Sequence, residues 1–399
     1  MELGGAERAL LGLLEILDVS QYDVDLFLMR HSGEMLKDIP YYVNLLPEIP
    51  QYACLAVPIR EVLKKRYYSV VFGRWLGKRR AQRRKDFLKI SGENEIALEY
   101  SHKYTRFFMP KIGTENYDLA ISFLTPHYFV KEKVMARQKI AWIHTDYSKV
   151  AVDPKSQLKM WAAYDQIISI SPQVTESFLS VFPELKGKIE VIPHFMPVKY
   201  IRRKANEFVG CEVTKETNSF MLLSIGRFSM AKNFDQIPDI CRRILKRGLE
   251  VKWYLIGYGR DEQLIREKII EAGMEEHVII LGKKTNPYPY IKECHLYVQP
   301  SRYEGKCVSV IEAQILGKPV VITSYPTASS QLEDGVDGVI VPMDNEGCAG
   351  GIAELLQNPA KMSRISTNCL KRDYSNAGEI EKIYVLMEQD ENNKNDYLS

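Results

Sequence analysis

The sequence lacks the long apolar run that a membrane-spanning helix requires. None of its apolar stretches reaches the roughly 18 consecutive residues that cross a bilayer. The opening residues, MELGGAERAL, also lack the basic start and the apolar segment of a secretory leader. These two absences argue against an integral membrane protein and a secreted protein, and they favour a cytoplasmic location.

Paired cysteines are missing as well. The seven cysteines are scattered, with no CxxC pair and no histidine at ligand spacing from them. This usage is typical of a reducing compartment, and it argues against structural zinc and against disulfides. The cysteines stand at positions 54, 211, 241, 294, 307, 348 and 369.

Acidic residues are absent from residues 62–85, which carry ten lysines and arginines. Because the whole chain has a net charge of +3, the remainder sums to −7 (3 − 10). Apolar and aromatic residues recur here at helical spacing, so we expect a cationic helix lying on an anionic membrane surface. Nucleic acid and a merely solvated face are the alternatives. The expected membrane-facing residues are Lys64, Lys65, Arg66, Tyr67, Arg74, Trp75, Lys78, Arg79 and Arg80.

Short apolar runs bounded by turns occur throughout the chain. They alternate with helical patterns, which indicates an α/β architecture with parallel sheets and crossover helices. Asp23 and Asp25 form a DVD triplet that resembles a metal-binding DxD motif, but we interpret it as a strand start because it has no acidic neighbours. The expected strands are residues 24–29, 53–57, 119–123, 139–143, 166–170, 189–193, 220–225, 251–257, 278–281, 296–299, 319–322 and 338–342.

One stretch, residues 296–322, predicts a strand, a loop, a helix that ends at Gly317 and a second strand. A loop that leads from a parallel strand into a helix N-terminus is where α/β proteins bind phosphorylated ligands. Glu304 lies in this loop. Glu312 is expected in the first helical turn, where a carboxylate can accept hydrogen bonds from a ribose diol. The backbone amides of residues 307–310 are expected to point at a phosphate.

Two cations follow the predicted strand 220–225. Arg227 comes directly after Gly226, and Lys232 stands five residues further on. A guanidinium fork and a lysine point charge beside one turn suit a diphosphate. Cations after strands and glutamates at helix starts are common separately. Their occurrence together in one half of the chain makes a phosphorylated ligand the stronger interpretation.

The first half of the chain supplies two further candidates. Gly4 and Gly5 precede an amphipathic run, which predicts a glycine-rich turn that can approach a phosphate closely. A flexible N-terminus is the alternative. Such a turn normally follows a strand, so we expect that the first strand is missing and that the natural N-terminus lies upstream of Met1. His144 lies in a polar triplet after strand 139–143, where α/β proteins bind ligands; a capped turn is the alternative.

Residues 226–342 resemble the C-terminal domain of glycosyltransferase family 4, a group of retaining sugar transferases with the GT-B fold. The resemblance rests on the motifs GRF followed by KN, YLIGYG, LG followed by NPYPYI, SRYEG and EA six residues apart, LGKPVVIT and DGVDGVIV. GGAERAL, KIAWIHTDYSK and YDQIISIS also resemble segments of that family's N-terminal domain. The likeness is to bacterial enzymes of capsule and cell-surface polysaccharide synthesis.

The resemblance implies two Rossmann-like domains that face a cleft, with a nucleotide-sugar donor bound mainly by the second. The implied catalytic residues are Glu304, His144, Lys232 and Arg227. The implied donor-binding residues are Gly4, Gly5, Gly226, Arg227, Lys232, Glu304, Gly305, Lys306, Cys307, Val308 and Glu312. Lys306 and Cys307 replace the apolar residue and proline often seen after the Glu-Gly pair, so we expect a different sugar pocket.

The implied reaction moves a sugar from a nucleotide-diphosphate donor, with UDP expected, to a lipid-linked or growing glycan. We expect it to need no metal and no cofactor, because cations and a helix N-terminus can stabilise the departing diphosphate. We expect a peripheral enzyme on the inner face of the cell membrane that binds no nucleic acid. The alternatives are another GT-B enzyme, such as an epimerase, and an inactive partner subunit that binds nucleotide-sugar or membrane.

Three segments are expected from these patterns. Residues 1–200 form an acceptor- and membrane-facing Rossmann-like domain, and residues 201–373 form the nucleotide-sugar-binding domain. Residues 374–390 form a C-terminal helix that packs back toward the N-terminal domain.

Overall fold

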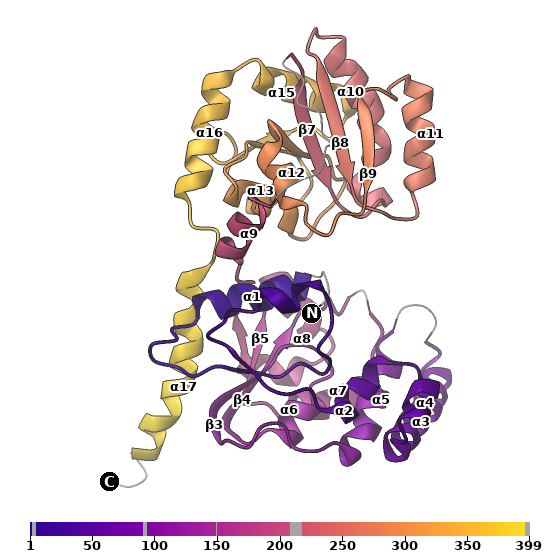
Figure 1. Ribbon diagram of the computed structural model, residues 1–399, viewed down its shortest axis with the longest axis vertical. Helices are drawn as coiled ribbons and strands as arrows, with labels where there is room; N and C mark the ends of the chain where they lie inside the picture. Colours follow the sequence, from indigo (N-terminus) through magenta and orange to yellow (C-terminus); the bar gives the residue numbers. More distant parts are fainter. Residues whose placement is uncertain (2–4, 91–93, 149, 208–217, 396–399) are drawn as a thin grey trace. The chain divides into compact units, whose positions relative to one another are not determined.

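The computed structural model describes residues 1, 5–90, 94–148, 150–207 and 218–395, and it forms two α/β units (Figure 1). Unit 1 consists of Met1–Met196 together with Asn376–Ser399, and unit 2 consists of Pro197–Ser375. The chain therefore leaves unit 1, forms unit 2 and returns to unit 1. The boundaries expected from the sequence, after residues 200 and 373, lie close to these divisions.

Unit 1 contains a four-stranded parallel sheet in the order β3-β4-β5-β6 and a separate parallel pair, β1-β2. Its strands are β1 Asp25–Leu26, β2 Asn44–Leu45, β3 Tyr117–Ser122, β4 Ala136–Ile143, β5 Gln166–Ser169 and β6 Ile189–Val191. Its α-helices are α1 Gly5–Ile16, α2 Pro50–Ala53, α3 Ile59–Lys64, α4 Tyr68–Leu88, α5 Ile96–Thr105, α6 Tyr128–Lys133, α7 Pro154–Trp161, α8 Pro172–Leu179 and α17 Ile380–Asn395. Its 3-10 helices are η1 Glu34–Asp38, η2 Cys54–Ala56, η3 Arg106–Phe108, η4 Pro183–Lys188 and η7 Ala377–Glu379.

Both faces of the four-stranded sheet are covered, because side chains alternate along β4. Ala141 and Ile143 pack into a cluster with side chains of α6, α7 and α8. Ile140 and Trp142 pack on the opposite face, against α1 and α17. The C-terminal helix α17 is therefore part of the core of unit 1, through Ile380, Ile383 and Leu386.

Unit 2 contains a six-stranded parallel sheet in the order β12-β11-β10-β7-β8-β9. Its strands are β7 Phe220–Ile225, β8 Val251–Ile256, β9 Val278–Gly282, β10 Leu296–Gln299, β11 Val320–Thr323 and β12 Val339–Val341. Its helices are α9 Val198–Lys204, η5 Met230–Lys232, η6 Phe234–Gln236, α10 Ile237–Leu245, α11 Glu262–Ala272, α12 Tyr288–Glu293, α13 Val308–Ile315, α14 Ala328–Gln331, α15 Asn345–Leu356 and α16 Pro359–Lys371. All six strands were predicted, with ends displaced by at most a few residues.

The strand order of unit 2 reverses between β7 and β10. From β7 the chain adds strands on one side of the sheet, and from β10 it adds them on the other. This is the order of the doubly wound dinucleotide-binding fold, in which ligands bind at the carboxyl ends of the two strands that flank the reversal. The loops after β7 and β10 are therefore where a ligand of unit 2 is expected.

Three sequence-based expectations are wrong, two for unit 1 and one for the segment that follows it. Residues 53–56 are helical rather than extended, because Pro50 starts a helix and a short apolar run does not by itself distinguish a strand from a buried helix. The strand expected at residues 24–29 is reduced to the two residues of β1, Asp25–Leu26. The polar, weakly patterned residues 197–219 predict an interdomain linker, but this segment begins with α9, whose Tyr200 and Ile201 are buried.

Candidate active site

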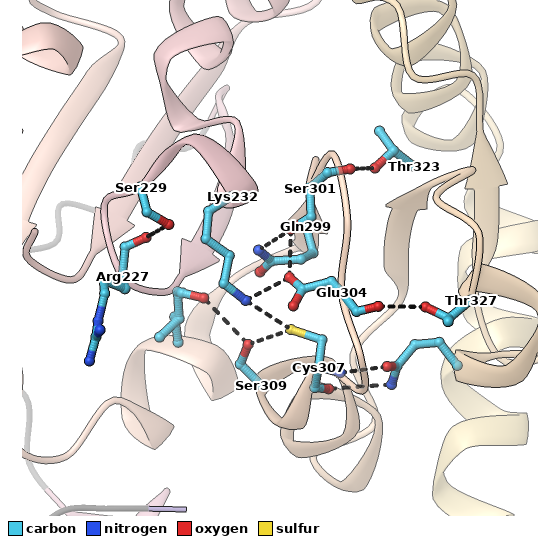
Figure 2. A network of polar contacts seen from close by, with 12 residues as sticks. Arg227, Ser229, Lys232, Gln299, Ser301, Glu304, Cys307, Ser309, Thr323 and Thr327 are labelled. Carbon is cyan, nitrogen blue, oxygen red and sulfur yellow. Dashed lines mark hydrogen bonds and ion pairs between the residues drawn. The ribbon is translucent and has the colours of Figure 1, made fainter. Parts of the chain in front are cut away.

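The loops after β7 and β10 bring Lys232 and Glu304 together (Figure 2). Lys232 Nζ lies 2.6 Å from Glu304 Oε1, and the two side chains are 20% and 9% exposed. The ion pair is therefore partly buried but open on one side to solvent. The Cβ that a larger residue would add at Gly226 would lie 3.4 Å from the Lys232 side chain, so Gly226 leaves room for the lysine to pass.

A chain of buried polar groups stands behind Glu304. Ser301 Oγ donates to Glu304 Oε1 at 2.6 Å and accepts from Gln299 Nε2 at 2.9 Å. Tyr297 donates from its hydroxyl to Ser309 Oγ at 2.8 Å. Because these side chains satisfy one another, the carboxylate of Glu304 is held in one orientation at the edge of the sheet. Sequence reasoning singled out none of Tyr297, Gln299, Ser301 and Ser309.

Arg227 does not join this network. Its side chain is exposed and extends away from Lys232 and Glu304 (Figure 2). Its guanidinium makes no hydrogen bond or ion pair with any residue that the structure describes. Its carbonyl accepts from Ser229 Oγ at 3.4 Å. Five donor groups are therefore available to an anion beside the same turn that carries Lys232.

Glu312 is placed deeper than expected. The helix α13 begins at Val308, so Glu312 lies in its second turn and not in the first. Its side chain is 1% exposed, and Oε1 accepts from the Tyr288 hydroxyl at 2.9 Å. The tyrosine therefore orients the carboxylate. The expected helix stop is confirmed, since Gly317 follows α13 with a φ of +68°.

The residues after Glu304 differ in what they present. Gly305 and Lys306 are exposed, whereas Cys307 is buried. The Cys307 amide donates to Gln331 Oε1 at 2.7 Å. Contrary to the expectation, it is therefore not available to a phosphate. The amides of Val308 and Ser309, the first two of α13, donate to no other described group. The open amides of this helix N-terminus are therefore those of Val308 and Ser309.

The Cys307 thiol faces the same ion pair. Its Sγ lies 3.9 Å from Lys232 Nζ and 3.3 Å from Ser309 Oγ. Burial raises the pKa of this thiol, although the nearby lysine opposes the shift. We therefore treat Cys307 as a neutral packing residue at neutral pH.

A second group of residues that sequence reasoning missed lies around α14. Thr327 Oγ1 donates to the Glu304 carbonyl at 2.8 Å. Tyr325 is 2% exposed, and its hydroxyl has no hydrogen-bond partner among the described residues. Burial raises the pKa of Tyr325, and the charges of Cys307 and Glu304 add to the shift. No sequence motif marks these residues, because their role depends on a contact between the loop after β10 and the segment after β11.

His144 belongs to unit 1, where it follows β4. Its Nδ1 lies 2.9 Å from His194 Nε2, and its ring packs against Phe123 with ring centroids 4.6 Å apart. Burial lowers the pKa of His144 to about 3, and the neighbouring His194 adds to the shift. His144 is therefore a neutral side chain at the carboxyl edge of the sheet. Gly5 is the first residue of α1, and Gly4 lies outside the described residues.

The basic segment forms two helices, α3 and α4, separated at Arg66, whose φ is +63°. Seven of the nine predicted membrane-facing residues are exposed: Lys64, Lys65, Arg66, Trp75, Lys78, Arg79 and Arg80. Two expectations within this set are wrong. Arg74 donates to the carbonyls of Cys54 and Val57 at 2.7 and 2.6 Å, and Tyr67 packs against the apolar core beneath α3 and α4.

Exposed aromatic side chains lie beside these cations. Phe72 is 52% exposed and Trp75 is 49% exposed, and their rings stack with centroids 6.1 Å apart. Phe108 of η3 meets Phe72 edge to face at 6.3 Å. Arg79 lies over the Trp75 ring at 5.6 Å. We call Phe72, Trp75 and Phe108 the aromatic patch.

In the part of the chain that the structure describes, no group of three or more His, Cys, Asp or Glu side chains is arranged to hold a metal ion. Within the same residues, no helix combines the length and the apolar character needed to cross a bilayer.

Residues 212–372 match the family model for glycosyl transferases group 1, and this range covers most of unit 2. The chain is 24% identical over 244 residues to the uncharacterised glycosyltransferase MJ1059 of Methanocaldococcus jannaschii. It is 29% identical over 136 residues to a poly(ribitol-phosphate) alpha-N-acetylglucosaminyltransferase of Staphylococcus aureus. It is 26% identical over 183 residues to an N-acetylgalactosamine-N,N'-diacetylbacillosaminyl-diphospho-undecaprenol 4-alpha-N-acetylgalactosaminyltransferase of Campylobacter jejuni.

These matches are partial on both sides. They cover 58%, 34% and 46% of this chain and 59%, 28% and 48% of the three relatives. Solved structures extend the likeness in fold. A glycosyltransferase from Rickettsia africae matches with a TM-score of 0.58 and 13% identity, over 97% of this chain and 95% of its own. Anabaena Alr3699/HepE, crystallised with UDP, matches with a TM-score of 0.54 and 15% identity, over 97% of both chains. The fold is therefore that of the two-domain GT-B glycosyltransferases, as expected.

Proposed function

We propose that this protein is a family 4 glycosyltransferase that moves a sugar from a nucleotide-diphosphate donor, with UDP as the nucleotide, to a lipid-linked or growing cell-surface glycan. The observation that carries the proposal is the pairing of Lys232 with Glu304 at the strand reversal of unit 2. The group 1 match over residues 212–372 includes both residues. The acceptor class is favoured by two relatives, one named for poly(ribitol-phosphate) and the other for a diphospho-undecaprenol saccharide.

The donor is proposed to bind along the loops after β7 and β10. Lys232, Arg227 and the amides of Val308 and Ser309 are the groups that neutralise the diphosphate. Lys232 carries three N–H donors and directs one to Glu304 and one, at 3.9 Å, to Cys307 Sγ, so a third can contact a phosphate without releasing the carboxylate. Glu304, Gly305 and Lys306 are assigned to the sugar, and Glu312, oriented by Tyr288, to the ribose hydroxyls.

The chemistry that these residues supply is stabilisation of the leaving group. As the glycosidic bond breaks, negative charge builds up on the diphosphate, and preorganised cations and amides lower the energy of that state. These are the functions that a divalent ion would otherwise perform, so we propose transfer without a metal. The expected result is full activity in the presence of EDTA. A loss of activity that Mn²⁺ restores would contradict this part of the proposal.

The remaining assignments concern unit 1. His144 is proposed to contact a substrate as a neutral hydrogen-bonding group, and Gly4 and Gly5 to form a turn near a phosphate. Retention of the anomeric configuration belongs to the family proposal, and NMR analysis of the product anomer tests it.

The aromatic patch and the surrounding cations are proposed to hold the enzyme on the cytoplasmic face of an anionic membrane. Aromatic rings at the headgroup level and cations that attract anionic lipid are the two elements of peripheral binding. This location would bring the enzyme to a lipid-linked acceptor.

The test is a panel of nucleotide sugars given to the purified full chain with membrane extract, with products analysed by mass. Transfer of one sugar to a lipid or glycan is the expected result. Conversion of the donor alone into an isomeric nucleotide sugar would indicate an epimerase. Binding without any turnover across the panel would indicate an inactive partner, and either outcome would overturn the proposal.

A further inference from the structure

The loop after β10 is hydrogen-bonded at two points, Glu304 and Cys307, to the segment that connects β11 to β12. At one end, Thr327 Oγ1 donates to the Glu304 carbonyl at 2.8 Å, as Figure 2 shows. At the other end, Gln331 receives the Cys307 N–H on Oε1 at 2.7 Å and returns Nε2 to the Cys307 carbonyl at 3.3 Å. The amide of Gln331 therefore pairs with the Cys307 backbone as a neighbouring strand would.

The two anchoring residues act from one face of a single turn. Thr327 is the residue before α14 and Gln331 is its last, so they stand four residues apart and their side chains lie on the same side. Gln331 is 8% exposed and Cys307 is 3% exposed. Because water is largely excluded there, loss of the glutamine would leave a buried amide and a buried carbonyl without partners.

The anchored backbone carries groups that the proposed donor site needs. Glu304, whose carboxylate faces Lys232, precedes the exposed pair Gly305 and Lys306. The open amides of Val308 and Ser309 follow Cys307 directly. A Cβ at Gly305 would meet nothing within 4 Å, so packing around Gly305 does not hold this part of the loop. The hydrogen bonds at Glu304 and Cys307 hold this part of the loop instead.

We propose that Gln331, together with Thr327, is a positioning residue for the distal phosphate of the donor. By holding the Cys307 backbone, Gln331 directs the amides of Val308 and Ser309 toward the phosphate that Lys232 also binds. The role depends on an amide that both accepts and donates, and only glutamine or asparagine has one among the side chains. This inference rests on the proposed function of the site, but the loop anchoring can be tested without it.

The first experiment uses the ligand-free full chain and hydrogen exchange read by mass spectrometry. Gln331→Met removes both hydrogen bonds while conserving side-chain length. The matched control is Gln314→Met, which replaces another buried glutamine of unit 2, one that donates to the Asp337 carbonyl at 3.1 Å away from the loop. We expect faster exchange in peptides covering residues 304–310 for Gln331→Met only. Unchanged exchange there would overturn the anchoring.

The second experiment separates positioning from a general loss of structure. We expect Gln331→Met to weaken UDP at least about tenfold and UMP less than about twofold, because only UDP carries the distal phosphate. An equal loss for UDP and UMP, or no loss for either, would overturn the positioning role. Thr327→Val should lower the preference for UDP over UMP in the same direction, and Thr327→Ser, which keeps the hydroxyl, should restore it.

A failure of the proposed donor class and a failure of the loop anchoring give different experimental results. If the wild-type chain binds neither UDP nor GDP, the proposed donor class is wrong and the positioning role falls with it. The exchange result then still decides whether Gln331 anchors the loop. If the wild-type chain prefers GDP to UDP, the GDP and GMP pair replaces the UDP and UMP pair with the same expected ratios.

Discussion

Lys232 and Glu304 show how a single contact links stability to the proposed chemistry. The ion pair is only partly exposed, so it is screened less by solvent than a surface pair. Both partners are also needed at the proposed donor site. Substitution of either residue therefore removes a group assigned to the proposed donor site and leaves the other without its ion-pair partner.

We predict that Lys232→Ala and Glu304→Gln each lower turnover at least about a hundredfold, as loss of a charge-stabilising group commonly does. The measurement is the rate of sugar transfer at saturating donor. Lys361→Ala is the control, because Lys361 also pairs with a glutamate of unit 2, Glu354, at 3.3 Å on the surface. Near-normal rates in both site variants would refute the assignment of this ion pair to the reaction.

Substitution of Tyr325 tests the stability of the free protein and the binding of the donor separately. Its buried hydroxyl has no partner among the described residues, and an unsatisfied buried group costs about 1–3 kcal/mol. We predict that Tyr325→Phe leaves the free protein as stable or up to about 1 kcal/mol more stable. If the hydroxyl is used by the bound donor, the same variant weakens UDP binding. Thermal unfolding with and without UDP measures both effects, and a clear loss of stability without ligand would contradict the prediction.

At the scale of elements, α4 serves two surfaces. One face packs against α5, where glycines allow the two backbones to approach closely. Its solvent-exposed side carries Phe72 and Trp75 of the aromatic patch, together with exposed cations. The sequence pattern suggested a single apolar stripe for lipid, but the structure divides it, with Val70 buried and Trp75 exposed. The two roles can be tested separately, since they use different residues.

For the packed face, we predict that Gly77→Ala destabilises unit 1 by about 1–3 kcal/mol, because backbone must shift to admit the added methyl. A Cβ at Gly77 would lie 2.6 Å from the Tyr100 carbonyl oxygen. Gly187→Ala is the control, since a Cβ there meets nothing within 4 Å. Urea unfolding measures the difference, and equal midpoints for the two variants would show that the close approach is not needed.

For the exposed face, we predict that Phe72→Ser with Trp75→Ser lowers binding to phosphatidylglycerol-containing vesicles at least about tenfold, through loss of buried aromatic area. Co-sedimentation measures it. Tyr41→Ser is the control, because Tyr41 is a 97% exposed aromatic of unit 1 outside the patch. Wild-type binding that is equal on neutral vesicles would refute the electrostatic contribution.

For the molecule as a whole, unit 1 buries histidines that cannot easily take up a proton. Burial lowers the pKa of His102 to about 4 and those of His127 and His144 to about 3, from an ordinary value of 6.5. Below about pH 6.5 the unfolded chain therefore binds more protons than the folded chain, and the free energy of unfolding falls with pH. The loss continues until the folded pKa values are reached. Glu95 and Glu99, whose pKa values burial raises, act in the opposite direction.

We predict that each buried histidine costs unit 1 about 1–2 kcal/mol of stability between pH 7 and pH 5. His127→Phe should therefore reduce the difference in stability between these two pH values. The measurement is the urea midpoint at both pH values, followed by hydrogen exchange of β4 peptides. His277→Gln in unit 2 is the control. An unchanged pH dependence in His127→Phe would contradict the burial argument.

Unit 2 could be largely derived from its sequence, and unit 1 much less so. Each strand of unit 2 is a short apolar run closed by glycine, proline or polar residues, and such local patterns are visible along the chain. The residues 24–57 of unit 1 have similar runs but form two short strands and short helices. Their conformation depends on packing against distant segments, as when Tyr117 donates to Asp25 at 2.7 Å.

The sequence alone determined the α/β class, the strands of unit 2 and the candidate residues Arg227, Lys232, Glu304 and Glu312, because these depend on local periodicity and on motif spacing. Only the tertiary structure decided which of them meet. It paired Lys232 with Glu304, left Arg227 exposed, buried Glu312 against Tyr288 and joined Gln331 to Cys307. The physical reason is that a parallel sheet brings loops together by strand order, and strand order is a property of the whole fold.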